Sequence, residues 1–175
     1  SSDVCSSDLT GVNTFGGPLT LSQTGDLTLT GFIFSGPQSI SATGDITVVP
    51  SSPAVVNAFG GQTINAGGGL IVQSSLLGDA QITASGGQTI DANYIEVTAP
   101  SGFAFITNFD SGDQTITTHG ANAQGEGLVV RSQGGFALID QQAPGFTQSI
   151  SANNADYVRV VGDGGGSAQI STTFG

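Results

Sequence analysis

A three-residue string of an amide, a hydroxyl residue and an isoleucine recurs along this chain. The copies are Gln38-Ser39-Ile40, Gln62-Thr63-Ile64, Gln88-Thr89-Ile90, Gln114-Thr115-Ile116 and Gln148-Ser149-Ile150. A weaker sixth copy, Leu19-Thr20-Leu21, aligns with the first of these without gaps. Repeats of about 20 to 50 residues are typical of solenoids, in which each repeat covers the next. The repeat therefore predicts a stack of similar units.

Two further short strands are expected in each repeat. The second strand carries two apolar residues two positions apart, namely Leu27 and Leu29, Ile46 and Val48, Leu70 and Val72, Ile95 and Val97, Leu128 and Val130, Val158 and Val160. The third carries a small residue before a branched one, as in Ala80 and Ile82. Gly, Asn, Asp, Ser and Pro, which favour turns, lie between the strands. We therefore expect an all-β parallel β-helix (β-solenoid) with three short strands per coil and about six coils.

The repeat also predicts which side chains stack. Successive residues of a strand point to opposite faces, so the repeated isoleucines should form one inward column. The repeated glutamines share their parity, and we expect their amides to form a hydrogen-bonded ladder. The longest insertion, between Thr118 and Leu128, should protrude as a surface loop.

The charge composition limits the classes of partner that the chain is expected to bind. The chain has 13 Asp plus Glu residues against two Arg and no Lys, with a formal net charge of -11. Nucleic acids and anionic membrane surfaces attract clustered Lys and Arg, so neither is expected as a partner. No apolar run approaches the roughly 20 residues of a spanning helix, so membrane insertion is not expected.

The N-terminal residues form a separate segment. The string Asp3-Val4-Cys5-Ser6-Ser7-Asp8-Leu9 resembles the translation of a short-read sequencing adapter. We therefore interpret residues 1–9 as a non-native tail and residues 10–175 as one β-solenoid fragment of a longer repeat array. Cys5 is the only cysteine of the chain, so an internal disulfide is excluded.

The outward face of the first strand is the candidate binding face. Its hydroxyl residues are Thr20, Ser39, Thr63, Thr89, Thr115, Thr117 and Ser149. Two hydroxyl columns on one flat face resemble the Thr-x-Thr face of solenoid ice-binding proteins, although Asn65 and Asp91 break the pattern. This face predicts ice or carbohydrate binding as an alternative to a purely structural role.

The chain has few residues that could form a catalytic site or a metal site. Some β-helix proteins act on polysaccharides through clustered carboxylates beside a basic residue, and that activity is a remote alternative here. Arg131 is expected to pair diagonally with Glu96 in the adjacent coil, which gives a structural explanation for both. His119 is the only histidine, and the Asp163 turn matches a calcium repeat only once. We expect no catalytic set, no metal site and no cofactor.

One stretch carries a family resemblance. The segment Gly60-Gly61-Gln62-Thr63-Ile64-Asn65-Ala66-Gly67-Gly68-Gly69-Leu70-Ile71-Val72 resembles repeats in filamentous-haemagglutinin-like exoproteins of Gram-negative bacteria. With its weaker copies the resemblance covers about residues 17–175. It implies a right-handed parallel β-helix, export by two-partner secretion and a cell-surface location. It also implies a role in adhesion or biofilm, with a host or environmental surface or glycan as partner.

Overall fold

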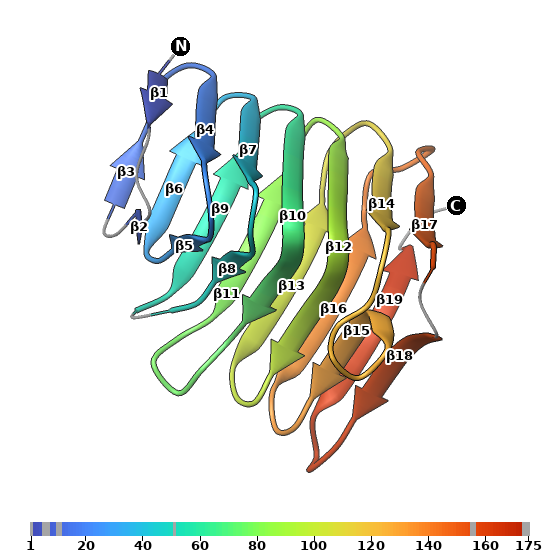
Figure 1. Ribbon diagram of the computed structural model, residues 1–175. Coiled ribbons are helices and arrows are strands. Elements are labelled where there is room, and N and C mark those ends of the chain that lie inside the picture. The colour runs from blue at the N-terminus through green and yellow to red at the C-terminus, as the bar shows by residue number, and fades with distance from the viewer. Residues whose placement is uncertain (1, 5–7, 10–11, 51, 155–156, 173–175) are drawn as a thin grey trace.

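The computed structural model describes residues 2–4, 8–9, 12–50, 52–154 and 157–172, with side chains from residue 13 onward. All the regular secondary structure in these residues consists of β-strands (Figure 1). All the pairings between named strands are parallel, and the strands form two sheets. The all-β expectation is confirmed, and the arrangement is consistent with a β-solenoid.

The strands fall into three rows, in each of which a strand pairs with its counterparts in the neighbouring repeats. The first row contains β1 (Ser2–Val4), β4 (Leu19–Gln23), β7 (Gln38–Ala42), β10 (Gln62–Gln73), β12 (Gln88–Ala99), β14 (Gln114–Thr118) and β17 (Gln148–Ala152). The second contains β2 (Asp8–Leu9), β5 (Leu27–Leu29), β8 (Ile46–Val48), the later parts of β10 and β12, β15 (Glu126–Ser132) and β18 (Tyr157–Gly162). The third contains β3 (Val12–Thr14), β6 (Phe32–Ser35), β9 (Ala54–Ala58), β11 (Ala80–Ala84), β13 (Phe103–Asn108), β16 (Phe136–Gln141) and β19 (Ser167–Thr172).

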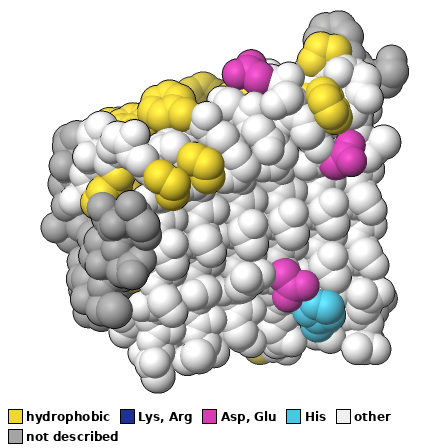
Figure 2. Space-filling view, turned by 90° about the horizontal axis from the view of Figure 1, so that it is seen from above, with side chains coloured by type: hydrophobic (Ala, Val, Ile, Leu, Met, Phe, Trp, Pro, Cys, Tyr) yellow, Lys and Arg dark blue, Asp and Glu magenta, His cyan; other side chains and the backbone are white. Residues whose placement is uncertain are grey.

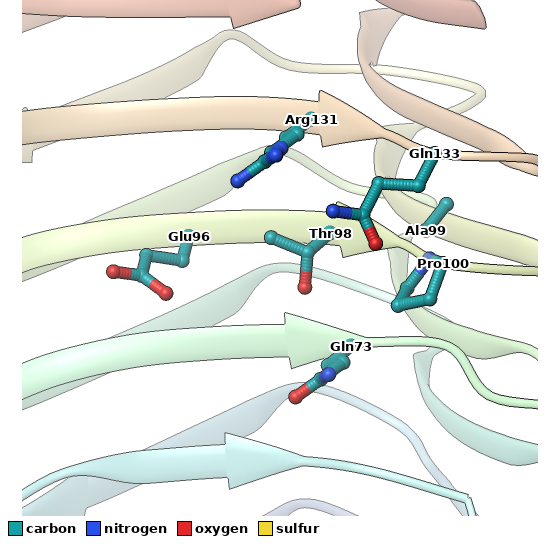
Figure 3. Close-up of a pocket in the computed structure, with 7 residues that line it drawn as sticks. All are labelled: Gln73, Glu96, Thr98, Ala99, Pro100, Arg131 and Gln133. Atoms are coloured by element: carbon teal, nitrogen blue, oxygen red, sulfur yellow. The ribbon is translucent and has the colours of Figure 1, made fainter. Parts of the chain in front are cut away.

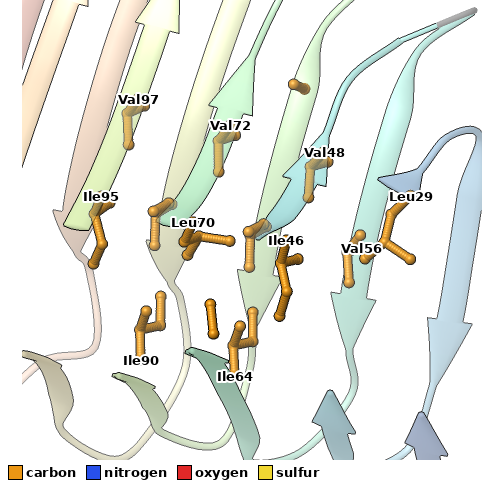
Figure 4. Packing of buried hydrophobic residues seen from close by; sticks show 14 of the residues in the cluster. Leu29, Ile46, Val48, Val56, Ile64, Leu70, Val72, Ile90, Ile95 and Val97 are labelled. Atoms are coloured by element: carbon orange, nitrogen blue, oxygen red, sulfur yellow. The ribbon is translucent and has the colours of Figure 1, made fainter. Parts of the chain in front are cut away.

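The register of these pairs follows the sequence repeat. Ile64 lies beside Ile40 on one side and Ile90 on the other, and Ile116 continues the row. These four isoleucines are buried, and the apolar pairs of the second row stack in the same way (Figure 4). The expected columns are therefore confirmed from β4 to β16. In the last repeat Ile150 is only half-buried.

The glutamine ladder is confirmed as well. Each glutamine donates a hydrogen bond from Nε2 to Oε1 of the glutamine in the preceding coil, at 2.7–2.8 Å, from Gln148 through Gln114, Gln88 and Gln62 to Gln38. Gln38 ends the ladder by donating to the backbone carbonyl of Asn57 at 2.8 Å. The ladder satisfies amide groups that are buried from Gln38 to Gln114, so burial costs them little.

Two of the coils differ from the expected pattern of separate short strands. The first and second strands run together as β10 and β12, each of 12 residues. β10 has one residue more than β12 between Ala66 and Gly69, where the register shifts. A Cβ on Gly67 would lie 2.4 Å from the carbonyl oxygen of Thr43, so this close approach of two coils requires glycine.

The segment interpreted as a non-native tail is partly described. Its strands β1 and β2 lie beside β4 and β5, at the blue end of the stack in Figure 1. Cys5 lies outside the described residues. The origin of residues 1–9 stays a prediction.

Candidate functional site

The predicted hydroxyl face is present as two aligned columns. Thr20, Ser39, Thr63, Thr89, Thr115 and Ser149 are successive cross-strand partners and form the first column. Thr117 lies in the second column, which continues through Asp91, Asn65, Ser41 and Ser22. All seven predicted residues are exposed or half-buried. The structure therefore brings the whole predicted face together.

Figure 2 shows the molecule from above, with a broad area that carries few charged or hydrophobic side chains. The single histidine is visible on it beside an acidic side chain. His119 Nε2 lies 2.8 Å from Asp91 Oδ2, and both side chains are about half exposed. This pair interrupts the second hydroxyl column, while the first column has only Thr and Ser from Thr20 to Ser149.

The second row of strands carries a group of charged and aromatic side chains, of which the sequence predicted only the proximity of Arg131 and Glu96. Both arginines, both glutamates and both tyrosines of the chain lie on three neighbouring strands, namely Tyr94 and Glu96 on β12, Glu126 and Arg131 on β15, Tyr157 and Arg159 on β18. Arg159 pairs in register with Val129, which pairs with Glu96. We call this region the β12–β15–β18 face.

The loop of residues 119–125 organises one side of this face, and Figure 1 shows it standing out between β14 and β15. Its Asn122 accepts backbone hydrogen bonds at Oδ1 from Gln124 and Glu126, at 3.0 and 2.9 Å. Its Nδ2 donates to Glu96 Oε1 at 2.7 Å and to Glu126 Oε2 at 3.0 Å. The expected protruding loop is therefore also tied to the sheet, because one amide bridges two carboxylates.

Glu126 forms the most strongly held carboxylate of the face. Its side chain is 8% exposed, and Arg159 Nη1 lies 3.0 Å from Oε1. Burial by itself would raise the pKa of Glu126, but hydrogen bonds from Asn122, Arg159 and Tyr157 together lower it. The same hydrogen bond with Glu126 raises the pKa of Arg159. Glu126 is therefore held as a carboxylate.

The expected ion pair between Arg131 and Glu96 is wrong. Arg131 Nη2 instead lies 3.8 Å from Asp163 Oδ2, and Glu96 accepts a hydrogen bond from Asn122. The physical reason is the 119–125 loop, whose Asn122 donates to Glu96 Oε1 at 2.7 Å. Arg131 Nε is buried and has no hydrogen-bond partner in the described part of the chain. The guanidinium is thus only loosely compensated.

Two hollows open on the β12–β15–β18 face. The first, of about 230 Å³, is lined by Gln73, Glu96, Thr98, Ala99, Pro100, Arg131 and Gln133 (Figure 3). The second, of about 310 Å³, is lined by Glu96, Thr98, Asn122, Gln124, Glu126, Val129, Arg131 and Arg159. Glu96, Thr98 and Arg131 line both, so the hollows adjoin.

The described residues contain no group of three or more His, Cys, Asp or Glu side chains placed to hold a metal ion. Within the same residues, no helix has the length and apolar character needed to cross a membrane. Comparisons with protein-family models, with curated proteins and with solved structures each find no match.

Proposed function

We propose that this chain is a structural and adhesive β-solenoid segment of a large secreted bacterial surface protein. Its rows of strands are held by apolar columns and by a continuous glutamine ladder. Such a core supports a stiff rod whose outer faces are free to vary, because each repeat contacts only its neighbours. We propose a structural role, without enzyme activity.

Finer features of the fold belong to the same proposal. We infer three short strands per coil, a right-handed path and about six coils. The three rows of cross-repeat pairs support the strand number. Right-handed crossovers between parallel strands are strongly preferred, because a right-twisted strand packs back onto its sheet that way. The fused strands β10 and β12 then represent two strands that turn a corner without a break.

The observation that carries the proposal is the burial that a coil gains by stacking, seen when the outermost strands β17, β18 and β19 are compared with an inner coil. Val158 and Val160 are 47% and 44% exposed there, whereas Leu70 and Val72 at the same positions of an inner coil are 0% exposed. Partly exposed apolar columns beside unpaired backbone groups favour the addition of another strand. We propose that coils stacked on one another in this way build the shaft.

An internal duplication tests the shaft directly. Inserting a second copy of residues 62–113 after Asp113 keeps the order of strands and adds two coils. The maximum dimension from small-angle X-ray scattering should increase by about 10 Å, since stacked strands lie about 4.8 Å apart. An unchanged maximum dimension, or a scattering profile of an unfolded chain, would contradict a shaft built by coil addition.

Secretion, cell-surface location and adhesion are supported by the resemblance of the repeat to those of filamentous-haemagglutinin-like exoproteins. Beads coated with the chain should adhere to host or environmental surfaces more than beads coated with a soluble protein of equal net charge. Equal adhesion of the two bead types would remove the adhesive part of the proposal and leave the structural part.

A second candidate function rests on the flat hydroxyl face in Figure 2. Its first column is straight and uncharged from Thr20 to Ser149, which suits a repeating surface such as ice or a glycan. Thermal hysteresis of the parent chain would favour ice, and a signal in a glycan screen would favour carbohydrate. In either case, replacing Thr63, Thr89 and Thr115 with Val should remove the signal. An unchanged signal would place the binding face elsewhere.

A further inference from the structure

The two adjoining hollows of the β12–β15–β18 face form one shallow groove across the coils. Gln73, at the end of β10, lines one end of the groove, and Arg159 on β18 lines the other. Three strand spacings separate β10 from β18, so the groove is about 14 Å long. Its direction follows the stack of coils, which suits an extended ligand. The combined hollows, of about 230 and 310 Å³, fall within the usual size of small-ligand sites.

Both hydrogen-bond donors and hydrogen-bond acceptors line this groove. Glu96 accepts, Arg131 donates, and Gln73, Gln133 and Thr98 do both. The groove has no aromatic side chain in its lining, and Val129 beneath the second hollow is only 4% exposed. A protein partner would normally bury aromatic or aliphatic anchors in the centre of its interface. The lining instead suits a ligand that is rich in hydroxyl groups.

The charges of the lining balance within each hollow. The first contains one glutamate and one arginine, and the second contains two of each. The whole chain carries a formal net charge of -11, which repels anionic ligands. A cationic ligand would meet the guanidinium groups of Arg131 and Arg159 in the same lining, and Glu126 is already paired with Arg159 at 3.0 Å. We propose that the groove binds a neutral oligosaccharide.

Two groups are already positioned for hydroxyls of such a ligand. Arg131 is weakly compensated, because its Nη2 lies 3.8 Å from Asp163 Oδ2 and its buried Nε lacks a partner in the described residues. Asn122 fixes Glu96 through a hydrogen bond of 2.7 Å. An acceptor that is already held in place lowers the ordering cost of binding, and the loosely paired Arg131 has donors to spare for the ligand. This site lies on a different face from the first-strand hydroxyl columns and does not depend on the adhesive proposal.

Titration calorimetry with neutral oligosaccharides tests the assignment. The probes are hexamers of β-1,4-glucose, β-1,4-xylose, α-1,4-glucose and β-1,4-mannose, with a galacturonate hexamer as the anionic comparison. We expect the parent chain to bind at least one neutral probe at millimolar or lower concentration. In a chain in which Gln73→Ala, Thr98→Val and Gln133→Ala are combined, the affinity should fall at least tenfold. These three outward residues lie outside the ion pairs of the face, so the fold should be retained.

A matched variant separates the two faces. The chain with Thr63→Val and Thr89→Val should bind the same probe with the affinity of the parent. If the affinity falls in this variant and not in the groove variant, the saccharide binds the hydroxyl face and the inference is wrong. Binding of the galacturonate hexamer alone, or failure of every neutral probe to bind at millimolar concentration, would also overturn it. Circular dichroism of both variants checks that they fold.

Discussion

The side-chain nitrogen of Gln88 lies 2.7 Å from the side-chain oxygen of Gln62, and the two residues are only 1% and 2% exposed. Gln88 also accepts a hydrogen bond at 2.8 Å from Gln114 in the next coil. A buried amide that donates to one coil and accepts from the other can form both bonds in only one register. The ladder therefore contributes to the specificity of the stack as well as to its stability.

Gln88→Leu should destabilise the chain by about 2 to 4 kcal/mol, because it leaves buried polar atoms of two neighbouring glutamines with fewer partners. Gln148→Leu is the matched control. Gln148 is half-buried and makes the ladder's last described bond, so the loss should be about 1 kcal/mol. Urea unfolding followed by circular dichroism measures both. Equal losses in the two variants would contradict a role of the ladder interior.

The isoleucine column predicts a second pair of variants. Ile90 is 0% exposed in the middle of the stack, and its replacement by Ala should cost about 2 to 5 kcal/mol through lost burial and a cavity. Ile150 occupies the same column in the last repeat but is half-buried, so Ile150→Ala should cost less than half as much. The midpoint of thermal unfolding ranks the two variants. A larger loss at Ile150 would show that the inner column does not dominate stability.

Glu126 makes stability depend on pH. Its hydrogen bonds lower its pKa in the fold below the unfolded value of about 4.3, so its contribution is complete above that pH and is lost as the pH falls through the lowered pKa. Glu126→Gln should therefore cost about 1 to 2 kcal/mol at neutral pH. The difference from the parent should narrow below about pH 4.

Asp110→Asn provides the control for Glu126→Gln, since it removes the same charge from an exposed residue. Its unfolding free energy should follow the parent within about 0.5 kcal/mol across the range. Urea unfolding at a series of pH values measures all three chains. If the difference in unfolding free energy between the parent and Glu126→Gln stays constant down to the lowest pH measured, the difference does not arise from ionisation of Glu126.

Most of the stacking could be predicted from the sequence, and most of the β12–β15–β18 face could not. The columns of Ile90 and Gln88 follow from strand alternation combined with a repeat, which places like residues beside each other in successive coils. The partner of Arg131 depends on the path of the 119–125 loop, which has no counterpart in other repeats. Asn122 sets that path through its own side-chain bonds, and a single asparagine in a polar insertion gives no such signal. One sequence signal does indicate this face, because all the Arg, Glu and Tyr residues of the chain lie on second strands.

The turns between coils offer a matched pair of glycines. Gly112 and Gly145 have nearly equal positive φ angles, 77° and 76°. A Cβ on Gly112 would lie 2.7 Å from the Cα of Gly87 in the neighbouring coil, whereas a Cβ on Gly145 would meet nothing within 4 Å. The backbone cost of alanine is thus the same at both positions, and only Gly112 adds a collision between coils.

Gly145→Ala should cost about 1 to 2 kcal/mol, the usual price of a left-handed conformation for an L-residue. Gly112→Ala should cost about 1 to 3 kcal/mol more, because the turn of one coil must move away from the backbone of the next. The difference between the two unfolding free energies isolates the contribution of close coil spacing at this corner. If the two variants lose equal stability, the turns are free to separate, and the coils are held together by their side-chain columns alone.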